Sequence, residues 1–203
     1  MTKTTRQVMV GVVLTAAAGA TTLFSGSTAF AAEGEQMTVV LQVIDYAHLS
    51  LSDLKGAEDE ATRIYRRADI KMVWVNPGAA PSEAHAGALH LNVLLLDREM
   101  AQNKIDTDQI GQNVLGKAAH ATARAYIFCH RVAAAIDDSR DFRTALGRVL
   151  AHEVGHLVLP VHSHSETGIM AAELDLSSTP QRFSRDQVAT IQKTIAADLR
   201  AKR

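Results

Sequence analysis

The sequence predicts an α+β fold, in which a twisted, mixed β-sheet packs against a buried helix and a further helix follows it. Two observations lead to this fold class. Runs rich in β-branched residues alternate with amphipathic stretches in the order strand, helix, several strands, helix, loop, helix. The stretch around Leu150 is apolar on most sides of a helical wheel, which is typical of a helix inside a core.

The composition is that of an ordinary folded domain. Of the 203 residues, 47% are hydrophobic and 21% are charged. The formal net charge of -1 gives no indication of binding to nucleic acid or to an anionic membrane surface. The single cysteine, Cys129, cannot form an internal disulfide, and we expect a buried thiol within a strand-like run.

Residues 1–31 have the pattern of a secretory signal peptide. Lys3 and Arg6 precede an apolar stretch, and Ala29 and Ala31 form a small-residue cleavage site. The apolar stretch is interrupted by Thr and Gly and is shorter than the ~20 residues that a membrane span needs. We therefore expect cleavage near Ala31, export to the periplasm or the medium without a stable membrane anchor, and one mature domain of residues 32–203.

Several apolar runs predict the strands of the sheet. Residues 98–113 are polar and mixed, and their pattern assigns no element. A loop rich in Pro, Gly and Ala is predicted at residues 76–88. The predicted strands are residues 37–46, 70–75, 89–97 and 124–132, with a short edge strand at 114–121.

Three segments have helical spacing of apolar residues, namely 50–70, 137–159 and 184–203. The second should end at about Leu159, because Pro160 cannot continue a helix. Each segment also has a capping signal at its start. The predicted caps are Ser52 for the first helix, Asp138 or Ser139 for the second, and a Ser184–Gln187 capping box for the third.

The second of these helices contains a metal-site pattern. His152 and His156 are four residues apart, so their imidazoles project from one face and can bind one zinc ion. Glu153 points ~100° around the helix from His152, where it can act as a general base without ligating the metal. Gly155 leaves one side of the helix without a side chain, so another element could pack closely there. Histidines in a core helix are more often structural, but the buried helix, the further histidines after it and the export signal together favour a zinc site.

The stretch from His152 to Met170 resembles the metzincin clan of zinc metallopeptidases, of the matrixin or archaemetzincin kind. The clan pattern is H-E-x-x-H-x-x-G-x-x-H followed by a Met-turn. His152, Glu153, His156 and His162 match that spacing, and Met170 in T-G-I-M resembles the Met-turn beneath the metal. The resemblance implies a zincin fold, a Zn²⁺ cofactor, and hydrolysis of a peptide or protein substrate.

One position departs from the clan pattern, because Leu159 stands where the clan has glycine. Leu159 before Pro160 favours an extended backbone. The chain would then return to the metal by a longer route than in the clan pattern, and the third ligand would come later in the sequence. Residues 37–192 also resemble a group of uncharacterised secreted bacterial metzincin-like proteins, in which the histidine before Ser and G-I-M corresponds to His164. We therefore expect His164 as the third ligand, with His162 as the alternative. Glu166 and Glu173 are weaker candidates, expected as surface acids.

The resemblance also implies that the edge strand at 114–121 pairs with an extended substrate. His120 on that strand is expected at the surface, although it could face the cleft. Ala172 stands where some clan members have a tyrosine, which leaves the metal and backbone N–H groups to stabilise the oxyanion. Two alternative functions remain open, a zinc-binding protein without proteolytic activity and a zinc hydrolase of a non-peptide amide. We expect a monomer.

Overall fold

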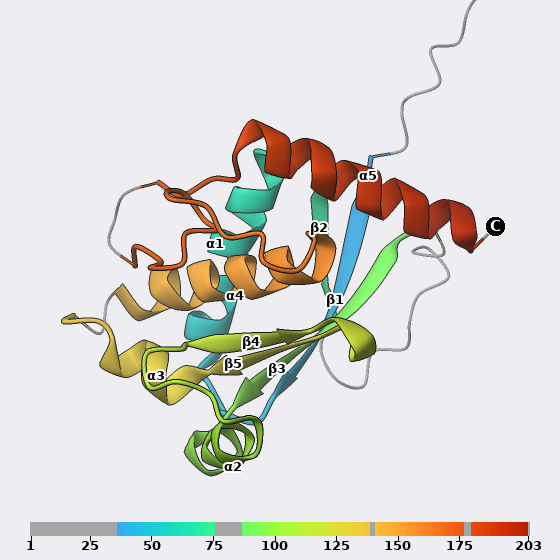
Figure 1. Ribbon diagram of the computed structural model, residues 1–203. Coiled ribbons are helices and arrows are strands. Elements are labelled where there is room, and N and C mark those ends of the chain that lie inside the picture. The colour runs from blue at the N-terminus through green and yellow to red at the C-terminus, as the bar shows by residue number, and fades with distance from the viewer. Residues whose placement is uncertain (1–35, 76–86, 139–140, 177–179, 203) are drawn as a thin grey trace, which may run out of the picture. The chain divides into compact units, whose positions relative to one another are not determined.

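The computed structural model describes residues 36–75, 87–138, 141–176 and 180–202 (Figure 1). These residues belong to one structural unit, Glu33–Arg203. The predicted signal peptide, most of the predicted loop at 76–88 and Ser139 lie outside the described residues. Within the described part of the chain, every helix is too short or too polar to cross a bilayer.

Five strands form one sheet in the order β2-β1-β3-β5-β4. β1 is parallel to β2 and β3, β3 is parallel to β5, and β4 is antiparallel to β5 at one edge. This mixed sheet was predicted, but the parallel unit β1–α1–β2 gives the fold more α/β character than the α+β class implies. The strands are β1 (Thr38–Asp45), β2 (Lys71–Val75), β3 (Leu89–Leu96), β4 (Gly116–Ala119) and β5 (Arg124–Phe128).

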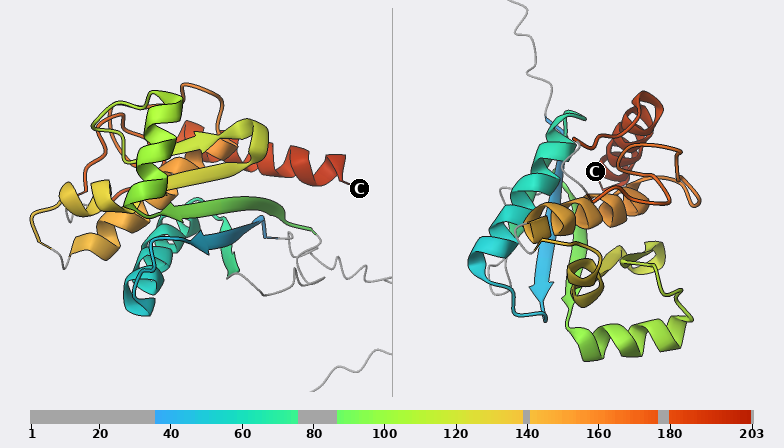
Figure 2. Two further views of the ribbon diagram at one scale, coloured as in Figure 1. Left: turned by 90° about the horizontal axis from the view of Figure 1, so that it is seen from below. Right: turned by 90° about the vertical axis from the view of Figure 1, so that its left-hand side faces the viewer.

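Helices cover both faces of the sheet, because the strand pleat sends alternate side chains to opposite sides. On β3, Leu91, Val93 and Leu95 join the core that contains α1 and α4, whereas Leu94 and Leu96 pack with α2. α2 therefore lies on the opposite face from α1 and α4 (Figure 2). The helices are α1 (Leu51–Arg66), α2 (Arg98–Asp108), α3 (Cys129–Ala134), α4 (Phe142–Val158) and α5 (Arg185–Ala201), with a 3-10 turn, η2, at His120–Thr122.

α4 runs through the main core and is held there from several sides. It packs closely on α1, since a Cβ on Gly147 would lie 2.6 Å from the Ala57 carbonyl oxygen. Arg148 is 1% exposed. Its Nε donates to Glu60 Oε1 at 3.5 Å, and its Nη1 donates to the Asp175 carbonyl at 3.1 Å. α4 is thus fixed relative to α1 and to the loop that follows the candidate site.

The predicted start of α4 was wrong, and its predicted end is confirmed. The helix begins after Asp141, whose side chain makes no capping hydrogen bond. The predicted cap Asp138 precedes the helix, and its carbonyl accepts a bond from Asp141 N at 2.9 Å. Leu159 is the C-cap residue, as Pro160 requires. The helix therefore begins later than the predicted cap Asp138, and the other predicted cap, Ser139, lies outside the described residues.

The predicted cap of α1 was also wrong, by two residues. Ser50 is the N-cap, and its Oγ accepts a hydrogen bond from Asp53 N at 3.1 Å, so the helix starts before the predicted Ser52. The α5 prediction is confirmed. Ser184 Oγ accepts from Gln187 N at 3.2 Å, and Gln187 Oε1 accepts from Ser184 N at 2.9 Å, which completes the capping box.

The strand predicted at 124–132 ends early, at Phe128, and the remainder forms α3. Cys129 and Val132 are both buried three residues apart, so the apolar run also satisfies a helical period. The prediction of a buried thiol at Cys129 is confirmed, since the side chain is 5% exposed and burial raises its pKa to about 12.

α2 had no sequence assignment. Asp97 caps it, with Oδ1 accepting from Met100 N at 2.7 Å, and Gln109 ends it in a left-handed conformation. Only Ala101 and Ile105 of this helix are buried. Two apolar contacts on an otherwise polar surface helix give too weak a period to be recognised.

Candidate metal centre

Three chemically active side chains of the site come from α4. His152 is 8% exposed and Glu153 is 7% exposed, whereas His156, one turn later, is half-buried. The helical spacing therefore places His152 and His156 on the same face, as predicted. The backbone hydrogen bonds of α4 and its packing in the core fix the positions of these two residues relative to each other.

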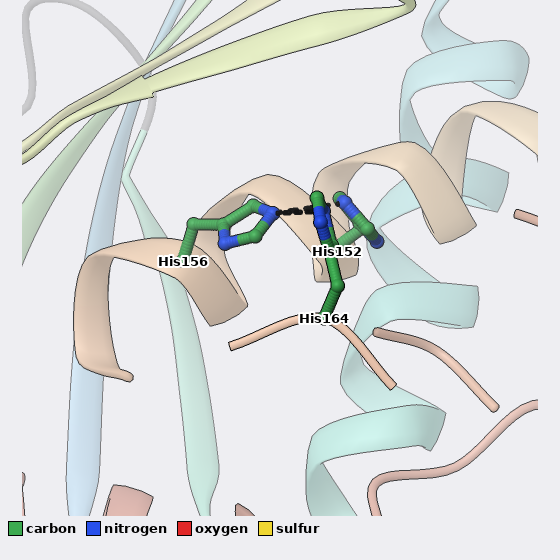
Figure 3. A group of neighbouring side chains, drawn as sticks. All are labelled: His152, His156 and His164. Atoms are coloured by element: carbon green, nitrogen blue, oxygen red, sulfur yellow. Dashed lines mark hydrogen bonds between the residues drawn. The ribbon is translucent and has the colours of Figure 1, made fainter. Parts of the chain in front are cut away.

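His164 joins these two histidines from the loop after α4, and the three side chains point toward one another (Figure 3). His156 Nε2 lies 3.0 Å from His152 Nε2 and 3.0 Å from His164 Nε2. Nitrogens around one tetrahedral zinc ion at ~2.0–2.1 Å are separated by ~3.3 Å, so the observed spacing fits a common metal ion. Among the described residues, these histidines form the one group that could hold a metal.

The tautomer of His152 is set by its second ring nitrogen. Nδ1 donates to the Ile169 carbonyl at 2.7 Å, which leaves the Nε2 lone pair directed at the other two histidines. Burial lowers the pKa of His152, and the charge of His164 adds to that effect, although the bond to Ile169 opposes it. His152 is therefore neutral at neutral pH, which is the form that binds a metal.

His156 is also held in its neutral form. Burial lowers its pKa to about 4, with further contributions from the charges of His152, His164 and His120. Imidazole nitrogens that converge on one point are a poor arrangement for mutual hydrogen bonding, because an Nε2 without a proton is only an acceptor. They are a suitable donor set for Zn²⁺.

The loop after α4 turns at His162. Leu159 is extended, with φ -107 and ψ 159, as its position before Pro160 predicts. His162 then adopts a left-handed conformation with φ 63 and is exposed. The chain therefore reverses two residues before His164, and His162 lies outside the three-histidine group. The turn of the loop therefore falls at His162, three residues after Leu159.

The end of this loop packs against α4. Met170 is fully buried, and a Cβ on Gly155 would lie 2.5 Å from its Sδ. Because Gly155 has no side chain, Met170 can approach this side of α4 closely, as the sequence indicated. Gly168 has φ 86, and a Cβ there would lie 2.6 Å from the Arg182 carbonyl oxygen, so this turn needs glycine. Ser165 N donates to Met170 O at 2.9 Å and closes the loop.

Glu153 lies beside the histidines, between α4 and β4. Burial raises its pKa to about 8, and a backbone hydrogen bond from Ala118 of β4 partly opposes that shift. A carboxyl group with such a pKa exchanges a proton near neutral pH. In the structure, no described acid other than Glu153 combines burial with a place beside the three histidines.

A cleft of about 1140 Å³ runs along the group and is lined by the three histidines, Glu153 and β4. β4 is shorter than the predicted strand at 114–121, because residues His120–Thr122 form the 3-10 turn. Its outer side pairs with no described strand. His120, expected at the surface, is exposed and lines the cleft, where its Nε2 lies 3.4 Å from the Leu159 carbonyl.

Other sequence candidates lie elsewhere. Glu166 and Glu173 are exposed, as expected of surface acids, and neither belongs to the metal group, although Glu173 lines the cleft. Sequence reasoning missed the Ile169 carbonyl, which orients His152, and Gly116, which lies against Glu153. A backbone carbonyl leaves no signal in the sequence. A glycine inside a predicted strand does, because it often marks a position where another part of the protein approaches the strand closely.

Comparisons with known proteins assign no family. No family model matches the sequence, and no curated protein matches it. Among solved structures, the chain is similar to archaemetzincin from Methanopyrus kandleri, with 15% identity, a TM-score of 0.48, and coverage of 81% of this chain and 98% of that chain. A match this distant carries no argument about activity, so the functional argument rests on the geometry of the site.

Proposed function

We propose that the protein is a zinc-dependent metalloendopeptidase, in which His152, His156 and His164 hold Zn²⁺ and Glu153 is the general base. One observation carries the proposal. Three imidazole Nε2 atoms converge in a cleft, with a buried carboxyl group on the same helix beside them. A protein that only stores metal has no use for such a carboxyl group.

The proposed roles follow from what each group can do. When bound, Zn²⁺ would polarise the substrate carbonyl and lower the pKa of water toward ~7. Glu153 takes a proton from the attacking water and delivers it to the amine that leaves, because a carboxyl group placed beside the metal can both accept and donate a proton. His152 and His156 keep their positions because α4 is held in the core. Met170 packs against Gly155 of α4, and its proposed role is to support the histidines by packing alone.

β4 is the proposed binding strand for the substrate. It borders the cleft and has one side without a described partner, so an extended peptide can add to it by backbone hydrogen bonds. A peptide held there lies along the side of the cleft where Ala118 contacts Glu153. The proposed substrates are therefore peptides or proteins in an extended conformation. We further propose that the protein acts as a monomer outside the cytoplasm, after removal of the predicted signal peptide.

The test compares Glu153→Gln with wild type in the zinc-loaded protein. Cleavage of a fluorogenic random-peptide library should fall at least ~100-fold, because a general base contributes ~10²–10⁴-fold to such reactions. Zinc affinity, measured by chelator competition, should change little. Glu166→Gln is the matched control, since Glu166 is an exposed acid outside the metal group.

Other outcomes would favour the alternative functions. If the wild type binds Zn²⁺ but cleaves no peptide of the library, the peptidase proposal fails and a non-proteolytic zinc protein remains. If it hydrolyses only non-peptide amides, the reaction class stands and the substrate class changes. Equal activity in wild type and Glu153→Gln would remove Glu153 from the mechanism.

A further inference from the structure

We infer that Gly116 is a positioning residue for Glu153, because the side chain of Glu153 occupies the space that any other residue at position 116 would need. Gly116 is the first residue of β4 and is buried. A Cβ built on it would lie 2.6 Å from Glu153 Cγ, 2.9 Å from Cδ and 2.9 Å from Oε1. All three distances are shorter than a carbon–carbon or carbon–oxygen contact allows.

The clash cannot be relieved by moving the backbone of β4. Gly116 pairs with Ile127 of β5, and the pairing continues to the end of the strand, where Ala119 pairs with Arg124. The Phe128 amide also donates to the Leu115 carbonyl at 2.9 Å, just before the strand. The helix carrying Glu153 is equally fixed in the core. The displaced group is therefore the Glu153 side chain.

The carboxyl group is further tied to the same strand two residues later. Glu153 accepts a backbone hydrogen bond from Ala118, which holds the carboxyl group against β4. Gly116 leaves the space and Ala118 provides the donor, so the short strand sets the position of the carboxyl group. A methyl group at position 116 should push that group away from Ala118.

The consequence for catalysis rests on the proposed function, but the consequence for geometry does not. A misplacement of about 1 Å in a catalytic group costs on the order of 100-fold in rate. Gly116→Ala should therefore lower kcat by on the order of 100-fold, with KM and zinc affinity within about threefold of wild type, since the three atoms nearest to the new Cβ all belong to Glu153. Position 116 would then couple the binding strand to the general base.

The experiment compares Gly116→Ala with Gly111→Ala. Gly111 is the matched control because it precedes the same strand and a Cβ there would meet only Val114 Cγ2, at 3.9 Å. Turnover of the fluorogenic random-peptide library gives kcat and KM, and chelator competition gives zinc affinity. The amide proton shift of Ala118 in NMR reports the hydrogen bond to Glu153 without any need for activity, and Glu153→Ala supplies the reference shift for a missing acceptor.

The expected result is an Ala118 amide shift in Gly116→Ala that moves toward the Glu153→Ala value, together with the loss of kcat. An unchanged amide shift overturns the inference. A changed amide shift with unchanged kcat in an active wild type removes the catalytic part. If the wild type cleaves no peptide, the amide shift still decides the geometric part, so the two failures are distinguishable.

A double variant covers the case in which Gly116→Ala does not fold. Glu153→Ala removes the atoms that the new methyl group would meet, so the combination Gly116→Ala with Glu153→Ala should fold with a Tm close to that of Glu153→Ala alone. If the combination loses as much Tm as Gly116→Ala does in the wild-type background, the clash is not with Glu153 and the inference is wrong.

Discussion

α4 and the loop from Leu159 to Ala171 contribute to the same group of three histidines by different means. α4 supplies two histidines and the carboxyl group from a buried helix, in which one turn of backbone fixes their relative positions. The loop supplies His164, an exposed residue whose position depends on two left-handed residues, His162 and Gly168, a bridge between Ser165 and Ala171, and a buried methionine. The helix contribution follows from residue spacing, whereas the loop contribution follows from backbone conformation.

This difference has an electrostatic side as well. The groups on α4 have shifted pKa values because burial disfavours their charged forms, with those of His152 and His156 lowered and that of Glu153 raised. The helix thus presents two neutral imidazoles and a carboxyl group that exchanges a proton near neutral pH. The loop adds the third imidazole at the edge of the cleft.

The largest expected effect separates the two histidines of the loop. His164→Ala should weaken zinc binding by about 100-fold or more, because it removes one of three protein ligands, a larger loss than the ~10–100-fold typical of ligand-supporting residues. His162→Ala should leave zinc affinity within about threefold of wild type, since His162 lies outside the metal group. Chelator competition measures both affinities. A large loss for His162→Ala instead would restore the standard clan spacing.

The second effect is the pH dependence of stability that follows from the burial of Glu153 on α4. In the metal-free protein, Glu153 has a pKa of about 8 when folded and its ordinary value of 4.5 when unfolded. The folded state then binds more protons between these values, so the contribution of Glu153 to stability is full below pH ~4.5 and is lost as the pH rises through about 8.

Denaturant unfolding from pH 5 to 9 measures this contribution as the difference between wild type and Glu153→Gln. Between pH 5 and about 8, the free energy of unfolding of wild type relative to the variant should fall by about 1.4 kcal/mol per pH unit, and by a few kcal/mol in total. Zinc should reduce the slope, because a nearby cation lowers the pKa of a carboxyl group. Parallel curves for the two proteins would contradict the proposed burial of Glu153.

The smallest expected effect tests the turn in the loop. His162 holds φ 63, which costs a residue with a Cβ roughly 1 kcal/mol. His162→Gly should therefore stabilise the protein by up to about 1 kcal/mol, and His162→Ala should not, in thermal unfolding of the zinc-loaded form. Destabilisation by glycine would show that the histidine side chain, and not the backbone angle, holds the turn.

The same contrast explains how far the sequence could be interpreted. Strands with continuous apolar runs, the buried helix and the Ser184–Gln187 capping box were predictable because their signals lie in residue types at fixed spacing. α2 was missed because only Ala101 and Ile105 face the core. The strand at 124–132 was extended too far because Cys129 and Val132 suit both periods.

Within the site, spacing predicted the convergence of His152 and His156 but not the support around them. The extended conformation of Leu159 followed from Pro160, and it favoured the longer route to His164. The left-handed turn at His162 was not predictable, because that conformation is uncommon for any residue other than glycine, although histidine is enriched among the exceptions. The contact of Gly116 with Glu153 depends on how β4 and α4 are placed in space, which no local pattern contains.

The most direct test of the account is a crystal structure of the zinc-loaded protein with anomalous data at the zinc edge. The account predicts one zinc peak within ~2.0–2.1 Å of the Nε2 atoms of His152, His156 and His164, with Glu153 beside the ion but not bound to it. A peak ligated by His162 in place of His164, or one ligated by Glu153, would contradict it.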